Sequence, residues 1–168
     1  AARPSYAQEF LDWLGELYAP PERYTAADIG SGTGKLSAQL LAAGFRVCGV
    51  EPNPDMRGAA EALLGGDSRF SSSNGTDHDT GLPDRSVDMV AAAQAFHWFD
   101  GPSFARECRR ILRPGGRAVL VWNVRGSAPV NQALAQVFRE HCPSFHGFTG
   151  GMGEDDPRIR DFFGGAYE

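Results

Sequence analysis

The chain has 168 residues, 42% of them hydrophobic, and a formal net charge of −5. This length suits one domain with a substantial buried core, and the acidic balance argues against nucleic acid as a partner. No apolar run approaches the roughly 18 residues of a membrane span, and no signal peptide is visible, so no membrane partner is expected. The three cysteines are far apart and form no CxxC pair, which is typical of reduced thiols and predicts a cytoplasmic protein.

The first predicted element is an amphipathic helix over residues 5–18. Aromatic and leucine side chains recur along it at i, i+3 and i+4 spacing, and Pro20 and Pro21 end it. Because the first residue is Ala1 and not Met, we expect a trimmed amino terminus.

A glycine loop between a strand and a helix is the most informative stretch of the sequence. Residues 26–29 form a short apolar run typical of a buried strand, and glycines then occupy alternate positions at Gly30, Gly32 and Gly34. A helical pattern follows and stops at Gly44. This order of elements presents backbone N–H groups and the positive end of a helix to a nucleotide-like ligand.

The spacing of these glycines argues against two common nucleotide-binding loops. The dinucleotide fingerprint G-x-G-x-x-G would need a glycine where Lys35 or Ser37 stands, and the Walker A spacing is absent. Asp28 directly precedes the loop at the strand end, where a carboxylate would repel phosphate. The loop therefore favours a cationic ligand, or one rich in hydroxyls and amines.

Glu51 ends a second predicted strand over residues 45–51. It lies about 20 residues beyond the glycine loop, where an acid can hydrogen-bond both hydroxyls of a ribose. A carboxylate suits this task because it accepts two hydrogen bonds at once. Glu51 therefore indicates the sugar of the ligand and not the whole cofactor, and a solvated strand end is the alternative.

The other predicted elements follow from apolar periodicity and from glycine and proline breaks. In chain order they are a helix beginning at Asn53 or Pro54, a weak strand over 69–73, a loop over 74–85, a strand over 86–95, a helix over 102–112, a turn over 113–117, a strand over 118–123 and a helix over 130–142. From residue 143 onward, repeated glycines interrupt the pattern and no element is predicted.

An aromatic cluster over residues 96–99 follows the predicted strand 86–95 at its carboxyl end. Ligands bind at this end of parallel strands. His97 lies within the cluster and is a candidate general base for an oxygen nucleophile. The alternative is a histidine that orders the loop by hydrogen bonding to the backbone. The arginines of the helix 102–112 are predicted to form a solvated face.

Together these motifs resemble a known family. Asp28-x-Gly30-x-Gly32-x-Gly34 after a strand resembles motif I of class I S-adenosylmethionine-dependent methyltransferases. The pattern Leu-Arg-Pro-Gly-Gly at 112–116, followed by a strand, is similar to another feature of that family. The resemblance covers roughly residues 3–125 and points to small-molecule, type 11-like methyltransferases.

The resemblance implies a fold, a cofactor and a reaction. The fold is α/β, a Rossmann-like three-layer αβα sandwich with a mostly parallel sheet. The cofactor is S-adenosyl-L-methionine, with S-adenosyl-L-homocysteine as product, and its methyl group passes to a small-molecule acceptor by in-line displacement. No metal is needed for this chemistry, and His141, Cys142 and His146 do not have the spacing of a zinc site.

The resemblance also implies which residues contact the cofactor. Asp28 and the glycine loop would hold its amino-acid end, Glu51 the ribose, and Thr76 or Asp77 the adenine, although Thr76 stands where the family usually has an acid. Met56 would cover the face of the adenine, or else pack in the core. The implied cofactor contacts are Asp28, Gly30, Ser31, Gly32, Gly34, Glu51, Pro52, Met56, Thr76, Asp77, Gln94 and Phe96.

We predict a single domain over residues 1–168, with a helical lid at 1–20, a core sheet over 26–125, and a helix and irregular tail over 126–168. The family sheet has two more strands, which we do not find, so the strand 118–123 is predicted to be an exposed apolar edge. We favour a shortened chain as the explanation. A second copy forming a dimer over the edge, or coverage by the tail, are the alternatives.

Other interpretations of function stay open beside the methyltransferase. A non-catalytic domain that binds S-adenosylmethionine or S-adenosylhomocysteine is favoured by the missing strands and by the altered residues 76–78. A nicotinamide-dependent oxidoreductase is disfavoured by the glycine spacing. Residues 3–6 resemble a family segment that closes over the cofactor, and the alternative for Tyr6 is a core side chain at a helix start.

Overall fold

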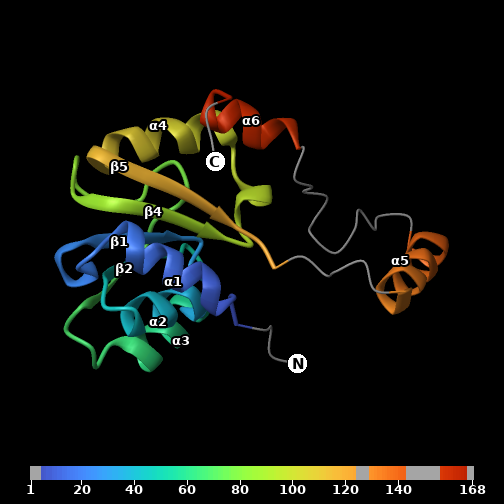
Figure 1. Cartoon of the computed structure of the whole chain (residues 1–168), viewed down its shortest axis with the longest axis horizontal. Coiled ribbons are helices and arrows are strands. Elements are labelled where there is room, and N and C mark those ends of the chain that lie inside the picture. The colour runs from blue at the N-terminus through green and yellow to red at the C-terminus, as the bar shows by residue number, and fades with distance from the viewer. Residues whose placement is uncertain (1–4, 124–128, 143–155, 166–168) are drawn as a thin grey trace. The chain divides into compact units, whose positions relative to one another are not determined.

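Five parallel strands form one sheet in the computed structural model, which describes residues 5–123, 129–142 and 156–165 (Figure 1). The strands lie in the order β3-β2-β1-β4-β5, so the order reverses between β1 and β4. Their bounds are Thr25–Ile29 for β1, Arg46–Val50 for β2, Phe70–Ser73 for β3, Val87–Ala93 for β4 and Leu112–Val121 for β5. This arrangement confirms the predicted α/β fold.

Helices connect and cover the strands. The right-handed rule for parallel connections sends α2 and α3 to one face of the sheet and α4 to the other, as Figure 1 shows. The chain forms two compact units, Ala1–Val121 and Trp122–Glu168. The helices of the first unit are α1 Gln8–Leu17, η1 Pro21–Arg23, α2 Lys35–Ala42, α3 Pro54–Leu64, η2 Phe96–Trp98 and α4 Gly101–Ile111, and those of the second are α5 Pro129–His141 and α6 Pro157–Phe163.

One apolar cluster joins α1 and α2 to the sheet. It consists of side chains that the sequence pattern places on the inner faces of these helices and on the buried strands. Its buried members are Tyr6, Leu14, Tyr18, Ala26, Leu36, Leu40, Leu41, Phe45, Val47, Met89 and Ala91.

Tyr6 belongs to this core cluster, which supports the interpretation of a core tyrosine. Gln39 of α2 fixes the same segment, because its amide donates to the Tyr6 carbonyl (3.1 Å) and accepts from the Tyr6 N–H (3.0 Å). The first helix begins at Gln8 and not at residue 5, and residues 3 and 4 of the expected closing segment lie outside the described residues.

The start of α3 was predicted correctly because its signals are local. The Asn53 side chain accepts from the N–H groups of Asp55 (3.0 Å) and Met56 (3.2 Å), and Pro54 is the first helical residue. Both features are typical helix starts. This helix therefore begins directly after the end of β2.

The boundaries predicted for the last strand were wrong. The strand β5 runs from Leu112 to Val121 and contains the expected turn as an irregularity, since pairing with β4 passes from Leu112 directly to Arg117. A Cβ on Gly116 would lie 2.9 Å from the Asp88 carbonyl oxygen, so the backbone of β5 approaches β4 closely here. Among the described residues no strand pairs with the outer side of β5, which is an edge of the sheet.

The helix α6 was missed, because residues 126–168 were expected to hold one helix and an irregular tail. Its signals are nevertheless present in the sequence. The Asp156 side chain accepts from the Arg158 N–H (2.9 Å), Pro157 is the first helical residue, and Gly164 ends the helix with a φ of +64°.

Candidate cofactor site

The carboxyl ends of β1, β2, β3 and β4 carry the candidate site. In a sheet of this type ligands bind at this edge, where the strand order reverses. The segments concerned are the glycine loop 30–34, the turn 51–53, the loop 74–80 and the segment 94–100. Contacts between neighbouring segments link all of them into one surface.

The glycine loop has one crowded side and one open side. Gly30, Gly32 and Gly34 all have positive φ angles, which favour glycine. A Cβ on Gly30 would lie 2.8 Å from the Ala95 Cβ, whereas a Cβ on Gly32 would meet nothing within 4 Å. Gly34 has no side chain to cap the start of α2, and in the first turn of this helix the Ser37 N–H hydrogen-bonds to Asp28. A ligand therefore has room at Gly32.

Glu51 connects the glycine loop to the turn after β2. Its Oε2 accepts from the Gly32 N–H and its Oε1 from the Asn53 N–H, both at 2.9 Å. The carboxylate is buried and held at both oxygens. Each oxygen keeps a second lone pair, so the fixed carboxylate can still accept from two hydroxyls. This geometry fits the predicted ribose contact.

Arg57 supports this turn and was not predicted from the sequence. Its Nη1 donates to the Glu51 carbonyl (2.8 Å) and to the Asn74 side chain (3.0 Å), so it joins the ends of β2 and β3. The backbone N–H of Glu51 also donates to the Ser73 carbonyl (3.1 Å). The ribose candidate and the loop 74–80 are therefore direct neighbours.

Asp28 is a buried carboxylate, only 1% exposed. Its Oδ2 accepts from the Ser37 hydroxyl (2.7 Å), and among the described residues Oδ1 has no hydrogen-bond partner. Burial raises the pKa of Asp28 to about 6, and the nearby charge of Glu51 acts in the same direction. A buried carboxylate with so little compensation of its charge indicates that the part of the site next to Asp28 favours a positively charged ligand group.

Thr76 and Asp77, the predicted adenine contacts, lie in a tight turn after β3. The Thr76 hydroxyl accepts from the Asp79 N–H (3.1 Å), and the Thr76 N–H donates to the Asp79 carbonyl (2.8 Å). Asp77 contacts the His78 ring through Oδ1 (3.1 Å) and accepts from the Asp100 N–H through Oδ2 (3.2 Å). The turn is thereby linked to the start of α4.

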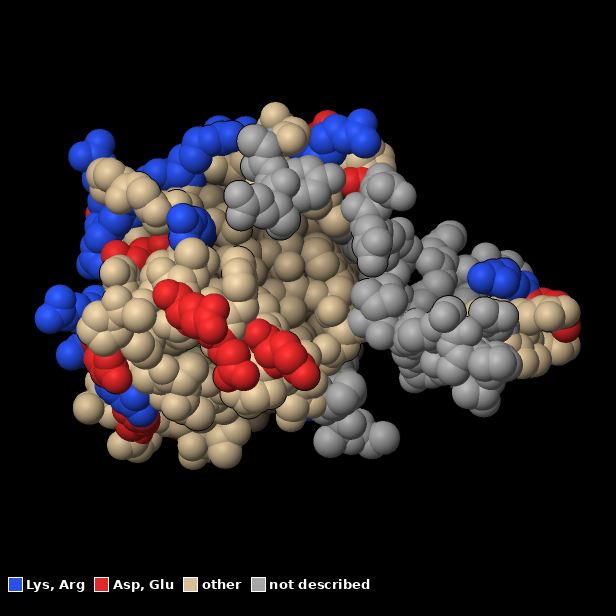
Figure 2. All heavy atoms as spheres, in the orientation of Figure 1, with Lys and Arg blue, Asp and Glu red and all other residues tan. Residues whose placement is uncertain are grey.

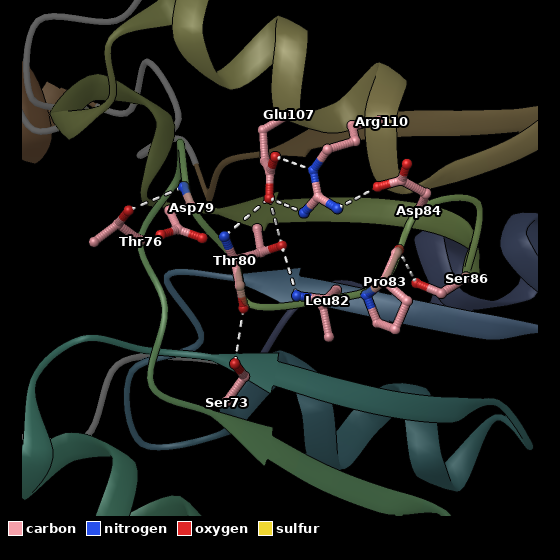
Figure 3. A network of polar contacts seen from close by, with 10 residues as sticks. All are labelled: Ser73, Thr76, Asp79, Thr80, Leu82, Pro83, Asp84, Ser86, Glu107 and Arg110. Atoms are coloured by element: carbon pink, nitrogen blue, oxygen red, sulfur yellow. Dashed lines mark hydrogen bonds and ion pairs between the residues drawn. The ribbon is translucent and has the colours of Figure 1, made fainter.

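A buried polar network behind this turn was not predicted (Figure 3). Thr80 donates from its N–H (2.9 Å) and its hydroxyl (2.6 Å) to Oε1 of Glu107 in α4. Arg110 donates to both oxygens of the same carboxylate. Hydrogen bonds from Arg110 and Thr80 lower the pKa of Glu107 to about 2, although burial opposes them.

The segment after β4 completes the site. Gln94 has a φ of +56°, which is uncommon for a non-glycine residue and occurs often at functional sites. The Phe96 ring is buried and packs against Phe99 and Phe104, so only its backbone is left for a ligand. His97 is partly exposed, and its ring lies 4.9 Å from that of Trp98.

Two apolar side chains at this edge are exposed. Met56 in the first turn of α3 is 47% exposed, so the alternative of core packing does not describe it. Trp98 is 81% exposed. Pro52 and Ser31 lie in the turn and loop that Glu51 connects, at the positions expected from the sequence. The structure thus gathers the predicted contacts at one edge of the sheet.

Basic side chains gather along the margin formed by α4 and β5, away from these segments (Figure 2). Two of them are paired with carboxylates: Arg110 with Asp84 (2.7 Å) and Arg113 with Asp88 (2.6 Å). Of the arginines on the predicted helix, Arg106 and Arg109 are exposed, as a solvated face requires, whereas Arg110 is held by the buried Glu107. Within the described ranges, no group of three or more His, Cys, Asp or Glu could hold a metal, and no helix has the length and apolarity to cross a membrane.

The chain is therefore an α/β domain whose parallel sheet carries a glycine loop, a fixed acid after its second strand and a buried acid before the loop. A model of the "Methyltransferase domain" family matches residues 27–120. The chain belongs to this methyltransferase family.

Relatives with known sequences or structures agree with this assignment. An uncharacterized methyltransferase of Mycobacterium tuberculosis is 42% identical over 123 residues, which are 73% of this chain and 48% of the relative. The chain thus spans about half the length of this relative. A solved structure from Anaeromyxobacter dehalogenans, named a "Putative Type II Methyltransferase", is 34% identical with a TM-score of 0.67 over 98% of this chain and 65% of that one.

A SAM-dependent methyltransferase from Aquifex aeolicus shares the fold, with a TM-score of 0.60 and 18% identity over 79% of this chain and 78% of that chain. The two proteins therefore share a fold.

Proposed function

We propose that the chain binds S-adenosyl-L-methionine and transfers its methyl group to a small-molecule acceptor. The observation that carries the proposal is the Glu51 carboxylate, held by the Gly32 and Asn53 N–H groups next to the open side of Gly32. Membership of the methyltransferase family supports it, and so does the acid Asp28 at a loop without a phosphate-binding spacing.

The residues of the chain have distinct tasks in this proposal. Glu51 accepts hydrogen bonds from the ribose hydroxyls, and Asp28 favours the positively charged end of the cofactor. The bound cofactor supplies a methyl group that is already activated by its sulfonium. The chain therefore acts chiefly by alignment, which can contribute about 7–11 kcal/mol to lowering a barrier.

His97 is the proposed base when the acceptor is a hydroxyl. It follows β4 at the carboxyl edge of the sheet and is partly exposed, so it can reach an acceptor beside the cofactor. A neutral imidazole near pH 7 can take the proton that the hydroxyl loses on methylation.

Calorimetry with S-adenosylhomocysteine, S-adenosylmethionine and NAD tests the binding step. We expect the first two to bind and NAD not to bind. Binding should weaken in Glu51→Ala and stay unchanged in Glu16→Ala, which removes an exposed glutamate of α1. Binding of NAD alone would overturn the proposal.

A second candidate is a domain that binds the cofactor without catalysis. The Thr76 hydroxyl at the usual position of an acid favours it, because the hydroxyl already accepts from the Asp79 N–H. Methyl transfer from labelled cofactor should be measured over a panel of hydroxyl, amine and carboxylate acceptors, with the longest chain that can be made. Tight cofactor binding without transfer to any acceptor would favour this second function.

A further inference from the structure

Gly75 and Thr80, the residues on either side of the turn 76–79, are in contact, and this pair is called the neck of the turn. A Cβ on Gly75 would lie 2.5 Å from the Thr80 carbonyl oxygen, so the two backbones are in direct contact and only glycine fits. Inside the neck, the Thr76 N–H donates to the Asp79 carbonyl (2.8 Å). The turn is therefore a compact unit whose position depends on how its neck is held.

The neck is held from both sides by Thr80 (Figure 3). The Ser73 hydroxyl of β3 donates to the Thr80 carbonyl (2.7 Å). On the other side, the Thr80 N–H and hydroxyl both donate to Oε1 of Glu107. Thr80 and Glu107 are buried, so water does not compete effectively for these hydrogen bonds.

Arg110 fixes the orientation of the Glu107 carboxylate. It donates from Nε to Oε2 (2.8 Å) and from Nη2 to Oε1 (2.7 Å), a bidentate pair within α4. Its Nη1 donates in addition to Asp84 Oδ1 (2.7 Å) beyond the turn. The network thus connects α4 to both ends of the loop that contains the turn.

The tip of the turn faces the rest of the site. Asp77 accepts from the Asp100 N–H, and Asn74 just before the turn shares Arg57 with the Glu51 carbonyl. A base attached to a ribose at Glu51 therefore has this turn as a neighbour.

We propose that Glu107 is a positioning residue for recognition of the adenine base, acting through Thr80 on the turn 76–79. The inference rests on the function proposed above. Hydrogen-bond acceptors of the turn 76–79 can accept from the exocyclic amino group of adenine. Hypoxanthine has a carbonyl oxygen in place of that amino group, and the same acceptors repel it. This preference requires a turn that cannot shift, and the network supplies that rigidity.

The test compares S-adenosylhomocysteine with S-inosylhomocysteine, its hypoxanthine analogue, by calorimetry on the whole chain. The wild type should prefer the adenine ligand at least tenfold. Glu107→Gln removes the charge and places an NH₂ group against Arg110, so the preference should fall below threefold. Thr80→Val removes only the hydroxyl and should act in the same direction, and the double variant should lose no more than Glu107→Gln alone.

Matched controls separate positioning from general stability. Thr80→Ser keeps the hydroxyl and should keep the preference. Arg113→Gln breaks the ion pair with Asp88, outside the turn, and should lower stability while the preference stays at the wild-type value. Thermal unfolding of every variant is measured in parallel.

The outcomes distinguish this inference from the proposed function. A wild type that binds neither ligand overturns both. A wild type that binds and discriminates, with Glu107→Gln or Thr80→Val discriminating equally well, overturns the positioning role alone. If Glu107→Gln does not fold, the comparison of Thr80→Val with Thr80→Ser decides.

Discussion

Asp28 gives the sharpest test of the site, because its burial makes a prediction about stability that needs no ligand. The folded protein holds this carboxyl at a pKa of about 6, against 3.8 for an ordinary aspartate. Between pH 3.8 and about pH 6, Asp28 keeps its proton in the folded chain and releases it in the unfolded chain. The contribution of Asp28 to stability is therefore fully present below about pH 4 and is lost as the pH rises through about 6.

The magnitude follows from the size of this pKa shift. At about 1.36 kcal/mol per unit, a rise from 3.8 to about 6 corresponds to about 3 kcal/mol lost at pH 8. The substitution Asp28→Asn keeps an acceptor for the Ser37 hydroxyl and leaves no charge to bury. The new amide NH₂ lacks an acceptor, which costs about 1–3 kcal/mol. We therefore expect the net gain in the free energy of unfolding on Asp28→Asn to be up to about 2 kcal/mol at pH 8. Relative to its effect at pH 4, where the amide cost is the same, the substitution should be more favourable at pH 8 by about 2–3 kcal/mol.

Urea unfolding of both proteins at pH 4 and pH 8 measures this difference directly. The informative quantity is the change between the two pH values, because the cost of the unpaired amide is the same at both. Asp12→Asn, at an exposed position of α1, is the control and should show no pH-dependent gain. An effect of Asp28→Asn that is equal at the two pH values would refute the reasoning.

The other predictions concern binding, packing and catalysis. Glu51→Ala should weaken S-adenosylhomocysteine binding by about 1.5–3 kcal/mol, the range for hydrogen bonds to a charged group. An unchanged Kd in calorimetry would show that Glu51 does not contact the ligand. Gly34→Ala should lower the free energy of unfolding more than Gly115→Ala. Both glycines have a φ above +80°, but only a Cβ at Gly34 would meet a leucine methyl, at 2.8 Å. Equal losses of stability in the two variants would contradict this prediction. His97→Ala should abolish transfer to a hydroxyl acceptor and leave cofactor binding intact, and full activity in a labelled-methyl assay would exclude His97 as the base.

The parts of the fold that could be predicted are those with local signals. Asn53 and Pro54 specify the start of α3 within two residues, and the glycine loop follows directly from its sequence. The boundaries of β5 could not be predicted in this way. Pro114, Gly115 and Gly116 are typical of a turn, and only the close approach of Gly116 to the Asp88 carbonyl reveals that the chain stays in the sheet.

The same distinction applies to the candidate site. Glu51 could be predicted because its distance along the chain from the glycine loop is a property of the motif. Glu107 and Arg57 could not be predicted, since their partners Thr80 and Asn74 lie 27 and 17 residues away. In the sequence alone, a glutamate three residues before an arginine on a helix indicates an exposed ion pair, and nothing in the pattern indicates that Glu107 is buried.

A positively charged ligand would account for the presence of two acids, Asp28 and Glu51, in the same site. Burial raises the pKa of Asp28 most and the charge of Glu51 adds to the rise, so their proximity disfavours the folded state in the absence of a ligand. Ionised Asp28 costs the folded state roughly 3 kcal/mol. A cation near Asp28 would remove part of that cost on binding. The cofactor should therefore stabilise the wild type more than Asp28→Asn at pH 8, and the two proteins should differ less at pH 4, where Asp28 is already neutral.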